Sequence, residues 1–393
     1  MKYLPRDIEG TVKRFLSIFP AVAITGPRQS GKSTMLQQVF GRKFKYVTFD
    51  DPAEIEFFLA DPKGFFNQYK GRLILDEVQK VPEVFNYLKM LIDKDRGNYG
   101  KFILTGSSQF SFIKSITETL AGRIGMLSLL PFQRQEIPLS LRKKQILFGS
   151  YPELLIRNYR NVRQWYGAYL QNYLERDVRS LSNIGNIRDF QRLISLLAAR
   201  TAQELNLSSL SRELGINVKT VQNWISILEA SYVVFLIAPY HNNLGKRIVK
   251  RPKIYFYDTG LICYLTGIRD FELLDKGPLQ GEIFENYVVA EILKAKFNYD
   301  RDLSIYYFRD NLGSEVDLII DDKEKKNITY LEIKKSQTFK IKMAQQIKKL
   351  IEKEKKYNKT VKGIVLYDGK QSGEVFNGIG YMNYSNFLEK FNK

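Results

Sequence analysis

Residues 26–33 read GPRQSGKS and match the phosphate-binding pattern G-x-x-x-x-G-K-[S/T] in full. This motif constrains the fold more than any other feature of the chain, because it needs a strand before it and a helix after it. The run 21–25 is short, apolar and partly β-branched, as in a buried parallel strand, and residues 34–40 can start a helix. The sequence therefore predicts a strand–loop–helix unit that holds phosphate at a helix N-terminus.

The loop carries the side chains that a nucleotide and Mg²⁺ require. Gly26 and Gly31 let the backbone curl so that its N–H groups converge on the phosphates. Lys32 is expected to neutralise the β/γ oxygens, and the Ser33 hydroxyl is expected to ligate Mg²⁺. We expect the nucleotide to contact Gly26, Pro27, Arg28, Gln29, Ser30, Gly31, Lys32, Ser33, Thr34 and Asp76.

A second motif, residues 72–77, is an apolar strand that ends in two acids. Asp76 is placed to hold the Mg²⁺ shell, and Glu77 to orient and activate the attacking water. An adjacent acid pair favours hydrolysis over nucleotide binding alone, although the pair could also form a surface turn that caps the next helix.

A third expected strand, residues 101–108, ends in hydroxyl groups. At the carboxyl end of a parallel sheet such groups face the ligand crevice, so Ser107 or Thr105 is a candidate contact for the γ-phosphate or the water. Capping of the following helix by Ser107 or Ser108 is an equal alternative.

Length and composition limit the remaining possibilities. A chain of 393 residues can form two or three domains with proper cores. No apolar run approaches a membrane span, and the first residues lack the apolar core of a signal peptide, so we expect a cytoplasmic protein without a membrane partner. The single cysteine, Cys263, and the single histidine, His241, leave no cluster for zinc.

The net charge of +19 is the strongest compositional fact. The excess is spread over the whole chain rather than confined to one tail. A field of this sign favours a polyanionic partner, and DNA is the partner that we expect. The alternative is a solvated lysine-rich surface.

The chain resembles the prokaryotic AAA-plus-type ATPases whose C-terminal half is catalogued as domain of unknown function 4143. The resemblance rests on residues 23–29, 75–82, 103–108, 120–123, 173–178 and 253–261. It implies an αβα sandwich that binds and hydrolyses ATP. In related ATPases an arginine at the place of Arg123 reaches the γ-phosphate of a neighbouring subunit, which would imply a homo-oligomer. The equal alternative is that Arg123 holds the strand 124–130 within its own domain.

The middle of the chain is helical, and residues 207–229 have the pattern of a helix–turn–helix. A first helix ends at Gly215, a second covers 218–229, and residues 232–237 would form the first strand of a winged helix. The side chains expected to face the major groove are Asn217, Lys219, Thr220, Gln222 and Asn223. Winged helices also serve as packing modules in ATPases, which is the alternative.

The last part of the chain predicts a helix over 281–293 and strands over 304–309, 315–320 and 330–334. The alternation of side chains in the last strand puts Glu332 and Lys334 on one face, and Asp317 can meet them there. With Glu285 from the helix, this order resembles the restriction-endonuclease-like nucleases. Glu285, Asp317 and Glu332 would then ligate Mg²⁺ and Lys334 would be catalytic, while a nuclease fold kept only for binding is the alternative.

These observations predict an α/β protein with a P-loop αβα sandwich over 1–140, a helical and winged-helix region over 141–275 and a nuclease-like α/β domain over 276–393. The expected function is Mg²⁺-dependent hydrolysis of ATP, coupled to DNA binding or processing. The expected catalytic residues are Lys32, Glu77, Ser107, Arg123 and Lys334. The alternative is a regulatory or signalling protein that uses its nucleotide state as a switch and has no nuclease activity.

Overall fold

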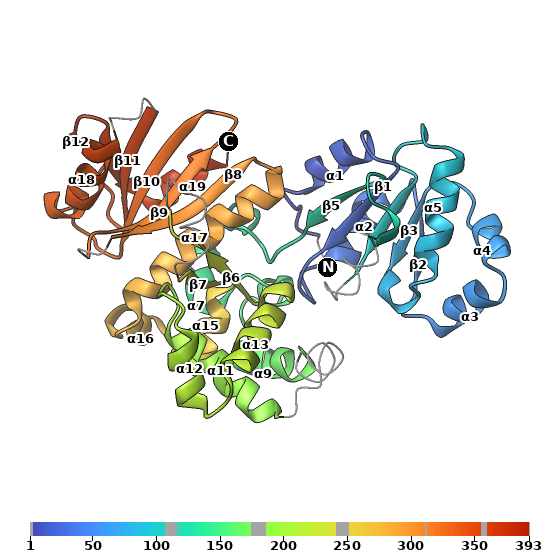
Figure 1. Cartoon of the computed structure of the whole chain (residues 1–393), viewed down its shortest axis with the longest axis horizontal. Coiled ribbons are helices and arrows are strands. Elements are labelled where there is room, and N and C mark those ends of the chain that lie inside the picture. Colours follow the sequence, from blue (N-terminus) through green and yellow to red (C-terminus); the bar gives the residue numbers. More distant parts are fainter. Residues whose placement is uncertain are drawn as a thin grey trace.

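Five short strands form the sheet of the N-terminal part of the chain (Figure 1). The computed structural model describes residues 3–106, 116, 118–173, 186–240, 251–310, 313–354 and 360–392. The strands are all parallel and lie in the order β2-β3-β4-β1-β5. Their bounds are Ala21–Thr25 (β1), Lys45–Thr48 (β2), Leu73–Asp76 (β3), Phe102–Thr105 (β4) and Ile124–Ser128 (β5).

Helices pack on both faces of this sheet, which explains why its central strands are apolar throughout. Every residue of β1, β3 and β4 is buried. The helices are Glu9–Leu16 (α1), Lys32–Phe40 (α2), Pro52–Ala60 (α3), Pro62–Gln68 (α4) and Val84–Lys94 (α5). β1 and β3 both run parallel to β4, which lies between them. The phosphate loop after β1 and the acids at the end of β3 therefore lie at the same edge of the sheet.

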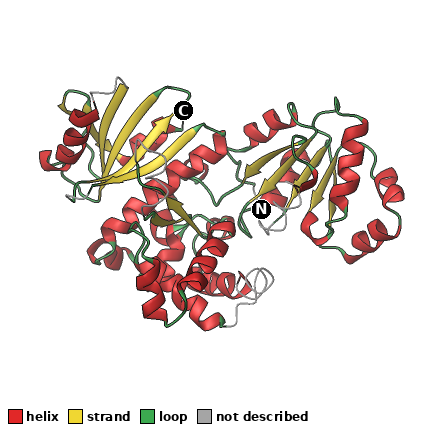
Figure 2. Ribbon diagram, in the orientation of Figure 1, coloured by secondary structure: helices red, strands yellow, loops and turns green. Residues whose placement is uncertain are grey.

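The middle part is mainly helical (Figure 2). The predicted helix over 218–229 corresponds to the helix Val218–Ala230. The predicted strand over 232–237 begins only at Val234, because Tyr232 adopts a left-handed backbone with φ of 57°. Two strands, Val234–Ile237 (β6) and Lys253–Phe256 (β7), pair antiparallel. The helices are Gln145–Phe148 (α7), Pro152–Ile156 (α8), Val162–Tyr173 (α9), Ile187–Ala199 (α11), Leu207–Leu214 (α12), Val218–Ala230 (α13), Thr259–Leu265 (α15) and Phe271–Lys276 (α16).

The C-terminal part is built on a six-stranded mixed sheet in the order β12-β13-β11-β10-β9-β8. Strands β10, β11 and β13 run parallel, and the other neighbours run antiparallel. Helices α17 and α19 pack on one face and α18 on the other. The bounds are Gln280–Tyr299 (α17), Leu303–Arg309 (β8), Glu315–Asp322 (β9), Asn327–Lys334 (β10), Gln345–Glu354 (α18), Thr360–Tyr367 (β11), Gly373–Phe376 (β12), Ile379–Asn383 (β13) and Tyr384–Phe391 (α19).

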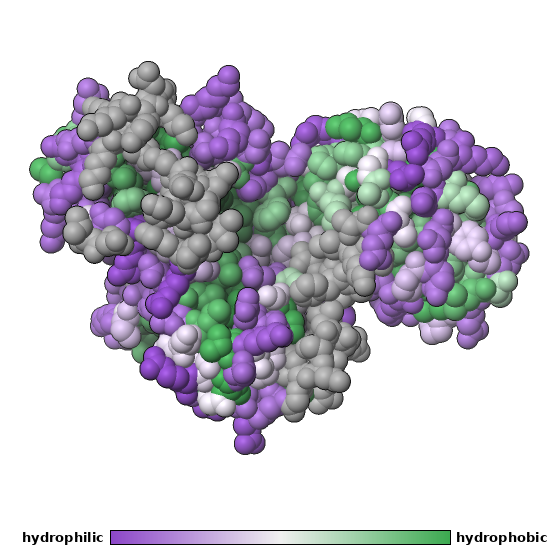
Figure 3. Space-filling view, in the orientation of Figure 1, coloured by the Kyte–Doolittle hydropathy of each residue, from purple (hydrophilic) through white to green (hydrophobic). Residues whose placement is uncertain are grey.

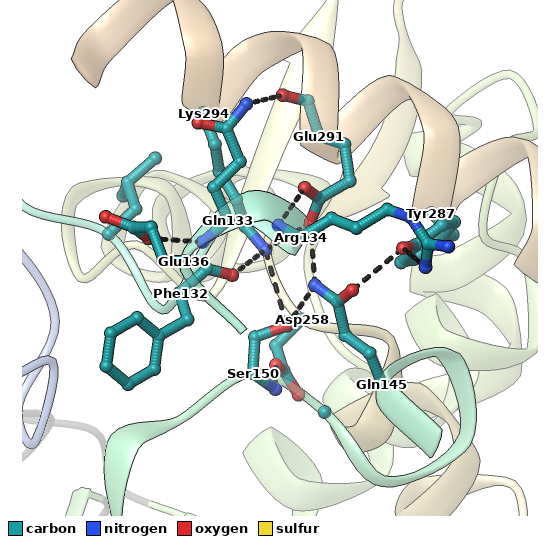
Figure 4. A network of polar contacts seen from close by, with 12 residues as sticks. Phe132, Gln133, Arg134, Glu136, Gln145, Ser150, Asp258, Tyr287, Glu291 and Lys294 are labelled. Carbon is teal, nitrogen blue, oxygen red and sulfur yellow. Dashed lines mark hydrogen bonds and ion pairs between the residues drawn. The ribbon is translucent and has the colours of Figure 1, made fainter. Parts of the chain in front are cut away.

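Helix α17 contacts all three parts of the chain. At its C-terminal end the carbonyl of Asn298 accepts a hydrogen bond of 2.6 Å from Thr11 of α1. Near its start Asn286 bonds both the N–H and the carbonyl of Phe256 in β7, at 2.7 and 2.9 Å. Between these points Glu291 and Lys294 enter the buried polar network of Figure 4. This helix therefore fixes the C-terminal part against the other two.

Among the described residues no helix combines the length and the apolar character that a membrane crossing requires. Hydrophilic side chains cover much of the visible face of the molecule, and a strip of hydrophobic side chains lies on the middle part (Figure 3).

Candidate functional site

The phosphate loop joins β1 to α2 and depends on its two glycines. Gly26 has φ of 140°, and a Cβ added there would lie 2.1 Å from the carbonyl oxygen of Leu129. Gly31 has φ of 91° and precedes the first turn of α2. Lys32 is buried, and its Nζ donates hydrogen bonds of 3.0 Å to the carbonyls of Gly26 and Pro27. The ammonium group thus lies over the loop.

Asp76, at the end of β3, is the acceptor of three hydroxyl groups. Ser33 at the start of α2 donates to its Oδ2 at 2.8 Å, and Tyr46 and Thr105 donate to the same carboxylate. Burial and the hydrogen bond to Asp76 raise the pKa of Tyr46 well above its ordinary value, so this hydroxyl stays protonated. The pair of Ser33 and Asp76 offers oxygen donors only, which is the donor set that Mg²⁺ prefers.

Glu77 is held in an unusual conformation beside this carboxylate. Its φ of 57° is left-handed, its N–H donates to Thr105 Oγ1 at 3.4 Å, and Gln79 donates to its side chain. A non-glycine residue in this region costs about 1–3 kcal/mol and occurs most often at functional sites. Thr105 is therefore hydrogen-bonded to both acids of the predicted motif, Asp76 and Glu77. The other candidate from this strand, Ser107, lies outside the described residues.

A pocket of about 400 Å³ opens over the loop, and a second of about 710 Å³ adjoins it. Both reach into the middle part of the chain, because residues of α9 line them. The first is lined by Arg28, Gln29, Gly31, Lys32, Ser33, Thr34, Glu77, Tyr169, Asn172 and Tyr173. The two pockets share Gln29, Gly31, Thr34, Tyr169 and Asn172. The larger pocket also takes residues of the N-terminal segment and α8, and Gln164 and Trp165 of α9.

Arg6 is hydrogen-bonded to the phosphate loop, and none of the sequence motifs indicated this role. Its guanidinium donates to the carbonyls of Ser30 at 2.8 Å and Leu130 at 2.6 Å. It also forms a buried ion pair with Glu136, with 3.0 Å between Nε and Oε1. A lone arginine before the first helix carries no pattern in the sequence that could have marked this role.

Arg123 forms an ion pair within its own domain. Its guanidinium contacts both carboxylate oxygens of Asp93 on α5, at 2.8 and 3.0 Å, and the carbonyl of Ala121 at 3.0 Å. The hydrogen bonds from Arg123 and then Arg96 lower the pKa of Asp93 to about 2. Arg123 is not among the residues that line the two pockets beside the phosphate loop. The ion pair joins Arg123 to α5, and a contact with the site of a neighbouring subunit stays a prediction.

The four predicted residues of the C-terminal part meet at one end of its sheet. Lys334 on β10 places its Nζ 3.2 Å from Asp317 Oδ2 and 2.7 Å from Glu332 Oε1. Glu285 on α17 is paired instead with Lys253 of β7, at 3.1 Å between Nζ and Oε1. The described residues contain no group of three His, Cys, Asp or Glu side chains arranged to hold a metal ion. In this arrangement Glu285 pairs with Lys253, and Asp317 and Glu332 pair with Lys334, so the role of these three acids as metal ligands stays a prediction.

Burial and neighbouring charges shift the pKa values of the residues in this acid cluster. Burial and the neighbouring Asp317 raise the pKa of Glu285 to about 7, although Lys253 and Tyr255 act in the opposite direction. Burial and Asp317 likewise raise the pKa of Glu332 to about 8, against the effect of Lys334. Burial alone would lower the pKa of Lys253, but Glu285, Asp317 and Glu315 outweigh it and raise that pKa.

The predicted recognition helix α13 has its polar residues outside. Val221, Trp224 and Leu228 are buried against the core of the middle part. Asn217 caps the helix through the N–H of Lys219 at 2.8 Å. The residues predicted to face DNA are exposed at Asn217, Lys219, Gln222 and Asn223 and half-buried at Thr220.

Comparison with known proteins agrees with this architecture. Family models match an AAA domain at residues 19–138, a domain of unknown function (DUF8612) at 140–272 and a domain of unknown function (DUF4143) at 280–387. The uncharacterized protein Rv2008c of Mycobacterium tuberculosis is 29% identical over 318 residues, which is 80% of this chain and 71% of the relative. The protein Mb2031c of Mycobacterium bovis matches to the same extent.

Among solved structures, a Walker-type ATPase of Pyrococcus abyssi matches with a TM-score of 0.46 and 15% identity, over 66% of this chain and 94% of that protein. DnaA of Aquifex aeolicus matches with a TM-score of 0.29 and 12% identity, over 56% of this chain and 85% of that protein. By its family models the chain joins an N-terminal AAA domain of the P-loop ATPase type to a C-terminal DUF4143 domain.

Proposed function

We propose that the chain is a Mg²⁺-dependent ATPase that converts ATP to ADP and phosphate. The observation that carries the proposal is the hydroxyl and carboxylate cluster at the ends of β3 and β4, where Ser33 and Thr105 both donate to Asp76 and Thr105 also receives the N–H of Glu77. The strand order places this cluster beside the phosphate loop. The division into units at residues 140 and 275 stays part of the proposal.

In this proposal each side chain has one task. Lys32 leaves its loop carbonyls to contact the β- and γ-phosphates, and Ser33 and Asp76 hold Mg²⁺. When bound, Mg²⁺ neutralises part of the negative charge on the phosphate oxygens. Glu77 lines the phosphate pocket and orients the attacking water, because its left-handed backbone turns it away from the strand direction. Hydrolysis then rests on positioning and on charge stabilisation.

The larger pocket gives the nucleoside a place next to the phosphates. It combines the aromatic rings of Tyr3, Trp165 and Tyr169 with the amides of Asn161 and Gln164. Aromatic faces stack on a base, and amides can read its polar edge. Because Trp165, Tyr169 and Gln164 belong to α9, a nucleotide bound in this way contacts both the N-terminal and the middle part of the chain.

The test is phosphate release by the full chain with Mg²⁺ and ATP, beside the binding of a fluorescent ATP analogue. Glu77→Gln should keep nucleotide binding and lose turnover by a factor on the order of 100 or more. Lys32→Ala should weaken binding itself. Glu83→Gln is the matched control, because it changes an exposed carboxylate six residues after Glu77, just before α5. Hydrolysis by Glu77→Gln at the wild-type rate would exclude Glu77 as the water-activating residue.

We further propose that the ATPase is coupled to DNA through α12 and α13. The support is the exposed polar face of α13 together with the net charge of +19. DNA affinity should fall steeply with salt, and Lys219→Ala should reduce that slope by about one unit. Lys349→Ala, an exposed lysine on α18, is the control. Absence of DNA binding at low salt would instead favour the regulatory nucleotide switch.

The nuclease activity expected from the sequence is not part of this proposal. The acids that should ligate its metal are paired with Lys253 and Lys334.

A further inference from the structure

Lys253 is a buried cation that the middle part of the chain inserts into the acid cluster of the C-terminal part. Its side chain is 3% exposed, and its Nζ lies 3.1 Å from Glu285 Oε1 and 2.6 Å from Glu315 Oε1. The hydroxyl of Tyr255, two residues further along β7, donates to the same Glu285 oxygen at 2.7 Å. Glu285 is thus held from two sides by residues of the middle part.

The other half of the cluster is closed by Lys334. Its Nζ pairs with Asp317 and Glu332, and the N–H of Ile333 donates to Asp317 Oδ2 at 2.7 Å. Lys253 and Lys334 thus pair with four carboxylates between them. Among the described residues Glu332 Oε2, an oxygen of a predicted metal ligand, is buried and has no hydrogen-bond partner.

The place of Lys253 is fixed by its strand. β7 pairs with β6, and Asn286 of α17 bonds the backbone of Phe256, three residues after Lys253. An isolated bridge between Glu204 and Lys253 holds the backbone on its other side. The ammonium group cannot leave the acids by a simple rotamer change, because its strand and its stem are both packed.

We infer that the ammonium group of Lys253 takes the place of a divalent cation in the acid cluster, so that the C-terminal part binds no Mg²⁺ or Mn²⁺ in this arrangement. A metal ion there would lie against a buried ammonium group, and the repulsion between like charges in a poorly solvated site opposes it. The acids of a metal-dependent nuclease are present in the chain, but one of them, Glu285, is paired with an ammonium group of the middle part. This inference does not depend on the ATPase activity.

Mn²⁺ binding to the nucleotide-free full chain, counted by electron paramagnetic resonance, tests the inference directly. Wild type and Asp317→Asn should bind the same number of ions. Lys253→Met should gain one Mn²⁺ per chain, because Glu285 then loses its ammonium partner and Lys334 is the remaining cation beside Glu285, Asp317 and Glu332. The gain should disappear in the double variant Lys253→Met/Asp317→Asn.

Lys294→Met is the matched control, since Lys294 is equally buried on α17 and paired with Glu291 at 2.9 Å outside the cluster. This variant should gain no Mn²⁺. The inference is overturned if wild type binds one more Mn²⁺ than Asp317→Asn. It is also overturned if Lys253→Met, shown by circular dichroism to be folded, gains none. The comparison of wild type with Asp317→Asn decides the matter even where Lys253→Met does not fold.

Discussion

The hydroxyl oxygen of Tyr232 lies 2.6 Å from the hydroxyl oxygen of Thr25, the last residue before the phosphate loop. It also lies 2.8 Å from the hydroxyl of Ser128 at the end of β5. Tyr232 lies in the short connection between α13, which ends at Ala230, and β6, in a left-handed conformation that turns the chain there. The segment that follows the helix proposed to contact DNA is therefore hydrogen-bonded to the strand that precedes the phosphate loop.

Tyr232→Phe should weaken the link between nucleotide and DNA. Loss of a buried hydroxyl that bonds two partners costs about 1–3 kcal/mol, so we expect the ATP dependence of DNA affinity to fall by about fivefold or more. The measurement is DNA binding with and without a non-hydrolysable ATP analogue. Tyr257→Phe is the control, because it removes a hydroxyl from the ring packed against Tyr232 at 5.8 Å between centroids. If the DNA affinity of Tyr232→Phe depends on ATP as it does in wild type, the hydroxyl of Tyr232 does not couple the two sites.

Arg6→Met should disturb both the fold and the loop. It leaves Glu136 as a buried charge without its partner, which typically costs about 3–5 kcal/mol. It also frees the carbonyl of Ser30, so the affinity for ATP should fall in any folded fraction. Urea unfolding and nucleotide titration measure the two effects.

Arg14→Met provides the comparison for Arg6, since Arg14 forms an exposed pair with Asp300 at 3.0 Å. Exposed pairs contribute about 0–1 kcal/mol, so this variant should unfold almost as wild type does. If Arg6→Met and Arg14→Met lower the free energy of unfolding equally, the buried ion pair of Arg6 stabilises the fold no more than an exposed one.

The sequence predicted the parts of the site that depend on local spacing. The phosphate loop is one continuous motif, and Asp76 and Glu77 follow a strand whose neighbours end at the same edge. Strand alternation also placed Glu332 and Lys334 on one face, and there Lys334 pairs with both Glu332 and Asp317. In each case a short stretch of sequence and the periodicity of one helix or strand were enough to predict where the side chains lie.

The contacts that sequence could not provide join distant segments. Arg6 and Glu136 are 130 residues apart, and Lys253 and Glu285 come from different parts of the chain. No periodicity marks a buried lysine as the partner of particular acids, because the pairing depends on how β7 packs against α17. For this reason the sequence analysis named Glu285 as a candidate metal ligand and did not indicate its ion pair with Lys253.

Arg123 gives a prediction that separates its two interpretations. If the ion pair with Asp93 is its role, Arg123→Ala should lower the unfolding midpoint, Asp93→Asn should lower it at least as much because Asp93 also pairs with Arg96, and both should leave ATP turnover per chain unchanged. Turnover is measured over a range of protein concentrations, beside thermal unfolding. A loss of turnover in Arg123→Ala alone, with a rate that rises with concentration in wild type, would assign Arg123 to the site of a neighbouring subunit.

The acid cluster should make the protein less stable as the pH rises from about 5 to 8. Burial and Asp317 raise the pKa of Glu285 to about 7 and that of Glu332 to about 8, above the ordinary value of 4.5. The folded chain therefore holds protons that the unfolded chain has already released. The stabilisation is complete below pH 4.5 and is lost as the pH passes through 7 and 8.

Urea unfolding of the wild-type chain at about pH 5, 6.5 and 8 should show this loss. One pKa unit corresponds to about 1.4 kcal/mol, and we expect the free energy of unfolding to fall by at least that amount over this range. Glu332→Gln removes one of the two groups and should flatten the decline. Glu272→Gln, an exposed acid paired with Lys276 on α16, should leave it unchanged. If wild type and Glu332→Gln show the same pH profile, Glu332 is not protonated in the folded protein, and its carboxylate is stabilised by Lys334 alone.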